Sequence, residues 1–365
     1  MIPEMRPVLI MAGGTGGHVY PALAVAEALR KQGVEVVWLG TRNGLESRVV
    51  PAAGFNMRWL SIVGLRGKSI ISKALFPVRL LIACLQAAVV ILRTKPRLVL
   101  GMGGFVSGPG GLMCKFLHRP LVIHEQNAVA GLTNRLLAGL ANSVLEAFPG
   151  TFKPQLNAYH TGNPVRDEIT QLIDPKERYA QRQGALNLLV IGGSQGARFL
   201  NQVVPQAVRS MPQALRPVIR HQAGAQLCEQ THSYYNDLQI DADIQPFYDD
   251  MAAAYSWADL VIARAGAMTV AELAAAGLPS ILIPFPSAVD DHQTINAGFL
   301  ANRGAAILAK QSGLTADRLG DWLSELAVDR GRLLSMARSA RELARPEATQ
   351  LVARECLEVA QGYWV

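Results

Sequence analysis

Residues 8–31, VLIMAGGTGGHVYPALAVAEALRK, hold the pattern that decides the fold. The apolar run Val8–Ala12 predicts a short buried strand, and four glycines follow within residues 13–17. Helical periodicity then predicts a helix over Pro21–Lys31, with the proline in its first turn. A strand, a glycine-rich turn and a helix in this order predict a parallel sheet that is covered by helices on both faces.

The same opening returns in the second half of the chain. Leu188–Ile191 predicts a buried strand that leads into Gly192–Arg198 (GGSQGAR) and a helix. Two such openings, about 180 residues apart in a chain of 365 residues, predict an α/β protein with two doubly wound domains. A turn signal at Gly162-Asn163-Pro164 divides residues 1–163 from residues 164–342. Residues 343–365 predict a C-terminal helix, and the sequence leaves open whether it crosses back to the first domain.

Composition excludes several classes of protein. Half of the residues are hydrophobic and 17% are charged, which excludes intrinsic disorder. No uncharged apolar run reaches 18 residues, so we expect no spanning helix, and Met1–Pro7 lacks the features of a signal peptide. The four cysteines are widely spaced, which predicts reduced thiols rather than a metal or redox site.

Charge is divided unevenly along the chain. Residues 1–163 carry 17 basic and 6 acidic side chains, net +11, whereas the rest carries 18 basic and 22 acidic side chains, net −4. Between Glu46 and Glu125 there are eleven Arg or Lys and no acidic residue. Such a region attracts nucleic acid, an anionic membrane or a phosphorylated substrate.

The glycine loops are candidate anion sites, because backbone N–H groups at a turn that opens a helix can approach a phosphate closely. The loop at residues 13–17 matches neither the dinucleotide fingerprint nor the Walker pattern, which disfavours nicotinamide and ATP. A second loop, Gly101–Gly111, also follows a predicted strand of the same sheet. Together the two loops suit a diphosphate at the crevice of that sheet.

Polar residues in the second half suit a nucleotide sugar. Arg264–Glu272 follows a strand and opens a helix, so that Glu272 is placed to accept two vicinal hydroxyls of a ribose. An ordinary surface glutamate is the alternative. The polar cluster Asp290–Gln293, with Asn296, follows another strand and is typical of sugar binding. Asp241-Ala242-Asp243 is a literal D-x-D, but it lies in a polar stretch, and we expect no metal site.

Two sites could supply acid–base chemistry. His18 lies at the first glycine loop, and His124-Glu125-Gln126-Asn127 follows another strand of the same sheet. A histidine beside a phosphate loop serves either as a general base or as a hydrogen-bond donor to the anion. The sequence does not decide between these roles.

Residues 70–92 predict a surface segment that meets a membrane. The run is apolar but broken by Lys73, Arg79 and Gln86. We expect residues 80–92 to form a core helix, and residues 70–79 to be exposed and to contact an anionic membrane through Lys73, Leu75, Phe76 and Arg79. Nucleic acid is the less favoured partner, because few aromatic residues accompany the basic ones.

Eight segments together resemble the MurG family, peripheral membrane glycosyltransferases of peptidoglycan synthesis. In chain order they are residues 13–26 (GGTGGHVYPALAVA), 61–68 (SIVGLRGK), 101–111 (GMGGFVSGPGG), 124–135 (HEQNAVAGLTNR), 162–166 (GNPVR), 192–198 (GGSQGAR), 264–279 (RAGAMTVAELAAAGLP) and 290–297 (DDHQTINA). The resemblance implies the GT-B architecture, two Rossmann-like domains with a cleft between them. It also implies transfer of N-acetylglucosamine from UDP-GlcNAc to the C4 hydroxyl of the muramoyl sugar of lipid I, with inversion, to give lipid II.

The resemblance also implies roles for individual residues. His18 is the candidate base, with Glu125 as the alternative, and UDP-GlcNAc is bound without a cofactor. The implied donor contacts are Arg166 and Ser194 on the diphosphate, Tyr248 by the uracil, Glu272 on the ribose, Asn127 and Gln293 on the sugar hydroxyls, and Ala267, Met268, Thr269, Val270 and Ala271 along the helix that carries Glu272. Thr15, Gly16 and Gly17 are expected where donor and acceptor meet, and Gly13, Gly14, Gly103 and Gly104 at the acceptor diphosphate.

Two alternatives remain at this point. One is another UDP-sugar enzyme of the same architecture, such as a glycolipid glucosyltransferase or a UDP-GlcNAc 2-epimerase. The other is a non-catalytic membrane or nucleic-acid binder that keeps the fold. The expected location is the cytoplasmic face of the cell membrane, with the protein bound peripherally.

Overall fold

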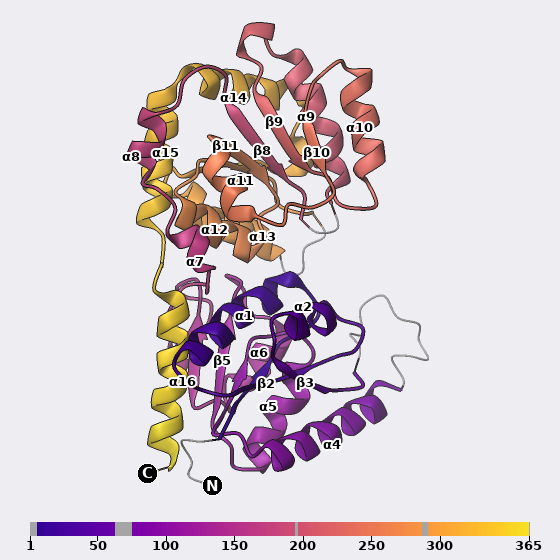
Figure 1. Ribbon diagram of the computed structural model, residues 1–365, viewed down its shortest axis with the longest axis vertical. Helices are drawn as coiled ribbons and strands as arrows, with labels where there is room; N and C mark the ends of the chain where they lie inside the picture. Colours follow the sequence, from indigo (N-terminus) through magenta and orange to yellow (C-terminus); the bar gives the residue numbers. More distant parts are fainter. Residues whose placement is uncertain (1–5, 63–74, 194–195, 287–290, 365) are drawn as a thin grey trace. The chain divides into compact units, whose positions relative to one another are not determined.

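The computed structural model describes residues 6–62, 75–193, 196–286 and 291–364. The chain forms two compact units, Met1–Val165 with Arg345–Val365, and Arg166–Ala344 (Figure 1). Each unit is built on its own parallel sheet with helices on both faces. The expected fold class, two doubly wound α/β domains, is therefore confirmed.

The first unit holds a seven-stranded sheet in the order β3-β2-β1-β4-β5-β6-β7. All neighbouring strands are parallel, so their carboxyl ends share one edge. The strand order reverses between β1 and β4, which is where doubly wound sheets bind ligands. The strands are β1 (Val8–Met11), β2 (Val36–Gly40), β3 (Asn56–Trp59), β4 (Leu98–Gly101), β5 (Leu121–Glu125), β6 (Ser143–Glu146) and β7 (Tyr159–His160).

Two apolar layers cover this sheet. One face packs against α1 and α16, which lie side by side, and the other against α4 and α5. Within α16, Val352, Ala353 and Cys356 are fully buried, so the C-terminal helix belongs to the core of the first unit. The helices are α1 (Gly16–Lys31), α2 (Glu46–Ala52), α4 (Phe76–Thr94), α5 (Ser107–Phe116), α6 (Leu132–Leu137) and α16 (Ala348–Trp364), with a short 3-10 turn η2 (Pro154–Leu156).

The second unit holds a six-stranded parallel sheet in the order β10-β9-β8-β11-β12-β13. Its strands are β8 (Asn187–Ile191), β9 (Val218–Gln222), β10 (Asp243–Gln245), β11 (Leu260–Ala263), β12 (Ser280–Leu282) and β13 (Ala306–Leu308). Its helices are α7 (Asp167–Thr170), α8 (Pro175–Ala180), α9 (Arg198–Ser210), α10 (Cys228–Asp237), α11 (Met251–Trp257), α12 (Ala267–Ala276), α13 (His292–Ala301), α14 (Ala316–Val328) and α15 (Arg330–Glu342), with 3-10 turns η3 (Gln213–Leu215) and η5 (Gln311–Gly313).

One predicted helix start is wrong. Helix α1 begins at Gly16, so Pro21 lies inside the helix rather than in its first turn. The glycines that follow Thr15 adopt helical geometry, and the helix therefore starts within the glycine loop itself. This places His18 in the first turn of α1, at the ligand-binding edge of the sheet.

Candidate active site

The two glycine loops of the first unit are in contact. Gly104 has φ +78°, and a Cβ at this position would collide with the carbonyl oxygen of Gly13. Gly103 has φ +90°, and a Cβ there would lie 2.8 Å from Nδ1 of His18. Both positions therefore require glycine, for the backbone conformation and for the close approach. The loops that follow β1 and β4 meet at one place, and His18 lies there.

His18 is held by a residue from a third loop. Its Nδ1 lies 2.7 Å from Oε1 of Gln126, which follows β5 directly. The imidazole is half-buried, and among the residues that the structure describes no group is hydrogen-bonded to its Nε2. The geometry thus leaves the outer nitrogen of His18 able to exchange a proton with a ligand.

Glu46 lies beneath the first glycine loop, a position that no sequence pattern indicated. Its carboxylate is fully buried and accepts hydrogen bonds from the N–H of Gly14 (3.0 Å) and from the N–H and hydroxyl of Thr41 (2.9 and 2.8 Å). The amide of Gly14, which was expected at the acceptor diphosphate, therefore donates to a side chain in this structure. Glu46 fixes the loop from below, while a bound anion would have to use other donors of the two loops.

Glu125 is buried and fully engaged. Oε1 accepts hydrogen bonds from the backbone and side-chain amides of Asn127 (3.0 and 3.2 Å). Oε2 accepts from the N–H of Gly131 (3.0 Å) and from Nδ2 of Asn134 (2.9 Å). These four donors use the four lone-pair sites of a carboxylate. Glu125 therefore organises the loop after β5. The residue as a whole is 2% exposed.

In the second unit, two polar side chains contact Glu272. Tyr255 of α11 donates its hydroxyl hydrogen to Oε2 of Glu272 at 2.9 Å, and the guanidinium of Arg166 lies 3.6 Å from Oε1. Burial raises the pKa of the Glu272 carboxyl above its usual range, and the charge of Arg166 and the Tyr255 hydroxyl partly offset that rise. Arg166 and Glu272 are thus brought together, and Tyr255 is a partner that the sequence did not reveal.

Glu272 lies on a helix that starts directly at a strand end. Helix α12 begins at Ala267, three residues after β11, and Gly266 caps it with an extended backbone. The N–H groups of Met268 and Thr269 in the first turn therefore have no acceptor within the helix and point toward its N-terminal end. That end carries a partial positive charge suited to an anion.

Arg264 donates hydrogen bonds to the loop that follows β12. Its guanidinium donates to the carbonyl oxygens of Ile283 (3.0 Å) and Pro284 (3.1 Å) and to Oε1 of Gln311 (2.7 Å). Burial lowers the pKa of Arg264 to about 10. The same loop is tied to α13, because the N–H of Phe285 donates to Oε1 of Gln293 at 2.9 Å. Arg264 thereby positions the segment that leads to Gln293.

Tyr248 and the D-x-D residue Asp243 contact each other and other protein groups. The hydroxyl of Tyr248 donates to the carbonyl oxygen of Asp243 at 3.1 Å, and Asp243 also lies 3.7 Å from the guanidinium of Arg220. Asp243, the second acidic residue of the literal D-x-D, therefore has protein partners in Arg220 of β9 and in Tyr248, which follows β10. Ser194, Lys73, Asp290 and most of residues 61–68 lie outside the described residues.

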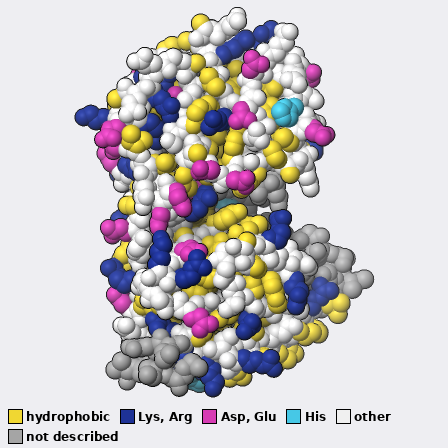
Figure 2. Space-filling model, viewed as in Figure 1, with side chains coloured by type: hydrophobic (Ala, Val, Ile, Leu, Met, Phe, Trp, Pro, Cys, Tyr) yellow, Lys and Arg dark blue, Asp and Glu magenta, His cyan; other side chains and the backbone are white. Residues whose placement is uncertain are grey.

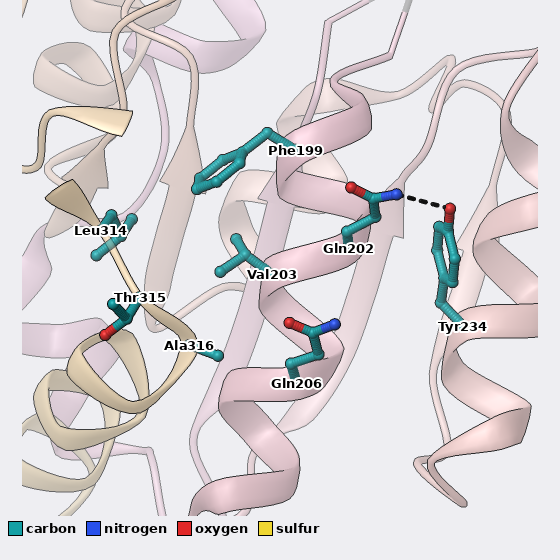
Figure 3. Close-up of a pocket in the computed structure, with 8 residues that line it drawn as sticks. All are labelled: Phe199, Gln202, Val203, Gln206, Tyr234, Leu314, Thr315 and Ala316. Carbon is teal, nitrogen blue, oxygen red and sulfur yellow. Dashed lines mark hydrogen bonds between the residues drawn. The ribbon is translucent and has the colours of Figure 1, made fainter. Parts of the chain in front are cut away.

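A separate pocket lies between α9, α10 and the start of α14 (Figure 3). Nε2 of Gln202 donates to the hydroxyl of Tyr234 across one side of it at 2.8 Å. None of its lining residues is a predicted site residue, and none is charged, so the pocket does not suit a diphosphate. The lining residues are Phe199, Gln202, Val203, Gln206, Tyr234, Leu314, Thr315 and Ala316.

Helix α4 is apolar on two faces. Ala83, Ala87 and Ile91 are buried in the core, whereas Leu81 (61%), Leu85 (60%) and Val78 (56%) are among its most exposed side chains. In Figure 2 hydrophobic and basic side chains lie next to one another over this part of the first unit. One face of residues 80–92 packs in the core, as expected, but the exposed apolar surface does not end at Arg79, because exposed leucine and valine side chains continue along the helix as far as Leu92.

The expectation that no helix could span a membrane also needs correction. Helix Phe76–Thr94 has 19 residues and contains an 18-residue window with a mean hydropathy of 1.9, which by length and composition alone would suffice to span a membrane. Arg79 and Arg93, the charged residues within this helix, do not lower its hydropathy enough to exclude a membrane span. However, the inner stripe of α4 packs in the core of the sheet, and core helices of soluble proteins have the same composition.

Comparison with known proteins defines the class. The glycosyltransferase family 28 N-terminal domain matches residues 8–146, and the family 28 C-terminal domain matches residues 187–352. The first match lies within the first unit, and the second covers most of the second unit and continues to residue 352, at the start of the C-terminal segment that packs on the first unit. The chain is therefore a glycosyltransferase of family 28.

Individual relatives identify the subfamily within family 28. The UDP-N-acetylglucosamine–N-acetylmuramyl-(pentapeptide) pyrophosphoryl-undecaprenol N-acetylglucosamine transferase of Nitrosococcus oceani is 55% identical over 97% of this chain and 99% of its own length. The enzyme of the same name from Alkalilimnicola ehrlichii is 56% identical over the same shares. The crystal structure of Acinetobacter baumannii MurG has a TM-score of 0.83, at 41% identity over 97% of this chain and 99% of that chain. Within family 28, the chain belongs to the MurG family.

Proposed function

We propose that this protein transfers N-acetylglucosamine from UDP-GlcNAc to the C4 hydroxyl of the N-acetylmuramoyl sugar of lipid I, forming lipid II. The observation that carries the proposal is the likeness, over 97% of the chain, to relatives named for that reaction. The lipid-linked diphosphate of such an acceptor also suits the glycine loops and the net charge of +11 of residues 1–163.

His18 acts as the general base in this proposal. Its Nε2 takes the proton of the C4 hydroxyl, and the oxygen attacks the anomeric carbon from the face opposite UDP. The bond from that carbon to the diphosphate oxygen breaks, and its electron pair leaves with UDP. A single displacement of this kind inverts the anomeric configuration. Glu125 serves to hold the loop after β5, because its four acceptor sites are occupied by donors from that loop and α6.

The donor is held by the second unit. Glu272 accepts hydrogen bonds from the ribose hydroxyls, while Tyr255 keeps the carboxylate in place through Oε2. Arg166, 3.6 Å from Glu272, and the first-turn amides of α12 bind the diphosphate and stabilise the negative charge that develops on UDP. Within the second unit, Ser194 contacts the phosphates, Tyr248 lies by the uracil and Gln293 binds the sugar hydroxyls. The resemblance also assigns Thr15–Gly17 and Asn127, which belong to the first unit, to the donor.

The protein acts at the cytoplasmic face of the cell membrane and binds it peripherally. The exposed side of α4 enters the lipid surface, and Leu75, Phe76 and Arg79 at its start are joined there by Leu81 and Leu85. Basic residues around the helix attract anionic head groups. The helix lies on the membrane rather than across it, because its inner stripe is part of the core of the first unit.

The test is to incubate the protein with UDP-GlcNAc and a soluble lipid I analogue, with and without a metal chelator. We expect a disaccharide product and stoichiometric release of UDP, both unaffected by the chelator. Conversion of UDP-GlcNAc without an acceptor would instead indicate an epimerase. Transfer to another glycolipid but not to the analogue would indicate a different transferase, and binding without turnover would indicate a non-catalytic protein.

A further inference from the structure

Three hydrogen bonds connect His18 to the interior of the first unit. Nδ1 of His18 lies 2.7 Å from Oε1 of Gln126, and Nε2 of Gln126 lies 3.0 Å from Nδ1 of His124. Nε2 of His124 in turn lies 3.0 Å from the carbonyl oxygen of Gly162. His124 and Gln126 are both buried, with exposed fractions of 0% and 1%. The three hydrogen bonds therefore lead from the half-buried imidazole of His18, through two buried side chains, to the main-chain carbonyl of Gly162.

The direction of each hydrogen bond follows from the carbonyl oxygens, which can only accept. The carbonyl of Gly162 fixes a hydrogen on Nε2 of His124, so Nδ1 of His124 is an acceptor. Nε2 of Gln126 donates to that Nδ1 and also to the carbonyl oxygen of His124 at 3.1 Å. The amide of Gln126 therefore cannot be turned around, and its Oε1 is the atom that faces His18. Nδ1 of His18 must be the donor.

We propose that Gln126 and His124 are positioning residues that hold His18 in the tautomer with its hydrogen on Nδ1 and its lone pair on Nε2. This inference rests on the proposed function, in which Nε2 takes the proton of the acceptor hydroxyl. A base imidazole needs a partner on its other nitrogen to fix both ring orientation and tautomer. Here the partner is a neutral amide, and the amide is itself fixed by a second histidine.

The surroundings keep this arrangement rigid. Burial lowers the pKa of His124 to about 4, so it stays neutral near pH 7 and keeps a single ring hydrogen. The main chain on both sides is tied as well, because Asn134 donates to the carbonyl oxygen of His124 (3.1 Å) and Asn163 to that of Gln126 (3.0 Å). Gly103 packs against the His18 ring from the other loop.

The direct test reads the tautomers in the intact protein. We would label the seven histidines with ¹⁵N and record long-range ¹H–¹⁵N correlation spectra at about pH 8.5, two units above the ordinary imidazole pKa. His18→Gln and His124→Gln variants assign the two signals. We expect the Nδ1–H form for His18 and the Nε2–H form for His124. The Nε2–H form at His18 would overturn the inference, whatever the variants do.

Kinetics of variants at position 126 give the second readout. In Gln126→Met, which neither donates nor accepts, we expect mixed tautomers at His18 and a fall in kcat of about tenfold, with the KM for UDP-GlcNAc changed less than about twofold. Gln126→Glu keeps an acceptor oxygen for Nδ1 of His18 but loses the donor to His124, so its kcat should lie between that of Gln126→Met and the wild-type value. The control is His160→Gln, since His160 also contacts a carbonyl oxygen, that of Ala147, at 3.1 Å in the same unit. It should leave kcat and the His18 tautomer unchanged.

These outcomes separate the inference from the proposed function. Unchanged kcat and tautomer in Gln126→Met, or equal kcat in Gln126→Met and Gln126→Glu, would overturn the positioning role while the wild type still forms product. A wild-type protein that forms no product, but shows both tautomers as expected, would instead overturn the function and leave the hydrogen-bond chain as observed.

Discussion

Tyr255 and Glu272 are joined by a hydrogen bond of 2.9 Å between the phenolic oxygen and Oε2 of the carboxylate. Tyr255 is 1% exposed, so its hydroxyl has little access to water as an alternative partner. The bond fixes the carboxylate of α12 from α11 and leaves Oε1 toward Arg166. The residue proposed to bind the ribose is thus held in one rotamer before the donor arrives.

Removing this bond should weaken donor binding. In Tyr255→Phe we expect the Kd for UDP-GlcNAc to rise about tenfold, because a buried acceptor loses its donor at a cost of about 1–3 kcal/mol. The matched control is Tyr234→Phe, whose hydroxyl contacts Gln202 in the same unit, and its Kd should stay unchanged. Isothermal titration measures both, and equal affinities of wild type and Tyr255→Phe would contradict the assigned role.

The same variant should shift the pH dependence of binding. Glu272 must be ionised to accept ribose hydroxyls, so affinity falls as the pH drops through its pKa, which burial raises. Tyr255 lowers that pKa, and its loss therefore raises it further. We expect the decline in affinity to begin at higher pH in Tyr255→Phe than in the wild type. Titrations across the range from pH 4.5 to 8 check this, and superimposable profiles would refute it.

Gly104 should tolerate no side chain. Gly104→Ala introduces both a strained φ of +78° and a collision with Gly13, whereas Gly33→Ala introduces a φ of +75° with nothing within 4 Å. Strain alone costs about 1–2 kcal/mol. We expect Gly33→Ala to lower thermal stability and leave kcat/KM intact, and Gly104→Ala to lower kcat/KM for the acceptor at least tenfold. Equal kcat/KM in both variants would mean that contact between the loops is unimportant.

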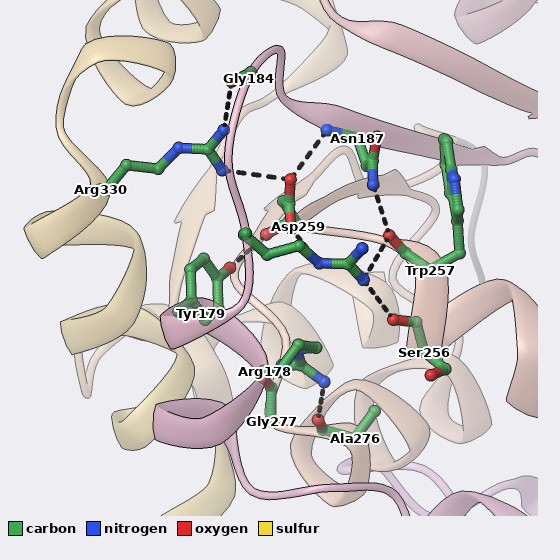
Figure 4. A network of polar contacts seen from close by, with 11 residues as sticks. Arg178, Tyr179, Gly184, Asn187, Ser256, Trp257, Asp259, Ala276, Gly277 and Arg330 are labelled. Atoms are coloured by element: carbon green, nitrogen blue, oxygen red, sulfur yellow. Dashed lines mark hydrogen bonds and ion pairs between the residues drawn. The ribbon is translucent and has the colours of Figure 1, made fainter.

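Asp259 should be important for stability but not for chemistry. Its buried carboxylate lies 3.1 Å from Arg182 and 3.1 Å from Arg330 and accepts from the N–H of Asn187 at 2.9 Å, so it joins α15 to the start of β8 (Figure 4). Asp259→Asn leaves two guanidinium groups uncompensated and should cost about 3–5 kcal/mol of unfolding free energy. Asp321→Asn on the exposed side of α14 is the control. Urea unfolding measures the difference, and a loss below about 1 kcal/mol would contradict it.

The exposed side of α4 should decide membrane binding. Leu81→Glu with Leu85→Glu removes two exposed leucines, each worth about 1.5–3 kcal/mol when fully buried in lipid, and adds two negative charges. Pelleting with anionic vesicles should fall at least tenfold, while turnover of a soluble acceptor analogue persists. Val328→Glu, at a side chain 66% exposed in the second unit, should bind vesicles normally. Unchanged pelleting of the double variant would mean that another surface binds the membrane.

The sequence predicted the repeated strand–loop–helix openings correctly, because glycine loops and apolar strands are local patterns. It could not reveal the outward apolar face of α4, since a helix that is apolar all round has no periodicity to separate the two sides. The sequence also did not predict the role of Glu46, because an isolated glutamate is expected to be solvent-exposed, and only the tertiary structure shows it buried beneath Gly14. The orientation of the Gln126 amide depends on the carbonyl groups of His124 in β5 and of Gly162, which are far apart in the sequence, and no sequence pattern encodes it.

The central claim is that His18 is the base for transfer of N-acetylglucosamine to the lipid-linked acceptor. The most direct measurement is kcat for transfer from UDP-GlcNAc to a lipid I analogue by wild type and by His18→Ala, together with the Kd of each protein for UDP-GlcNAc. We predict that kcat falls about 10²- to 10⁴-fold in His18→Ala, while the Kd changes less than about twofold. Equal losses in turnover and in donor affinity, or an unchanged kcat, would contradict the claim.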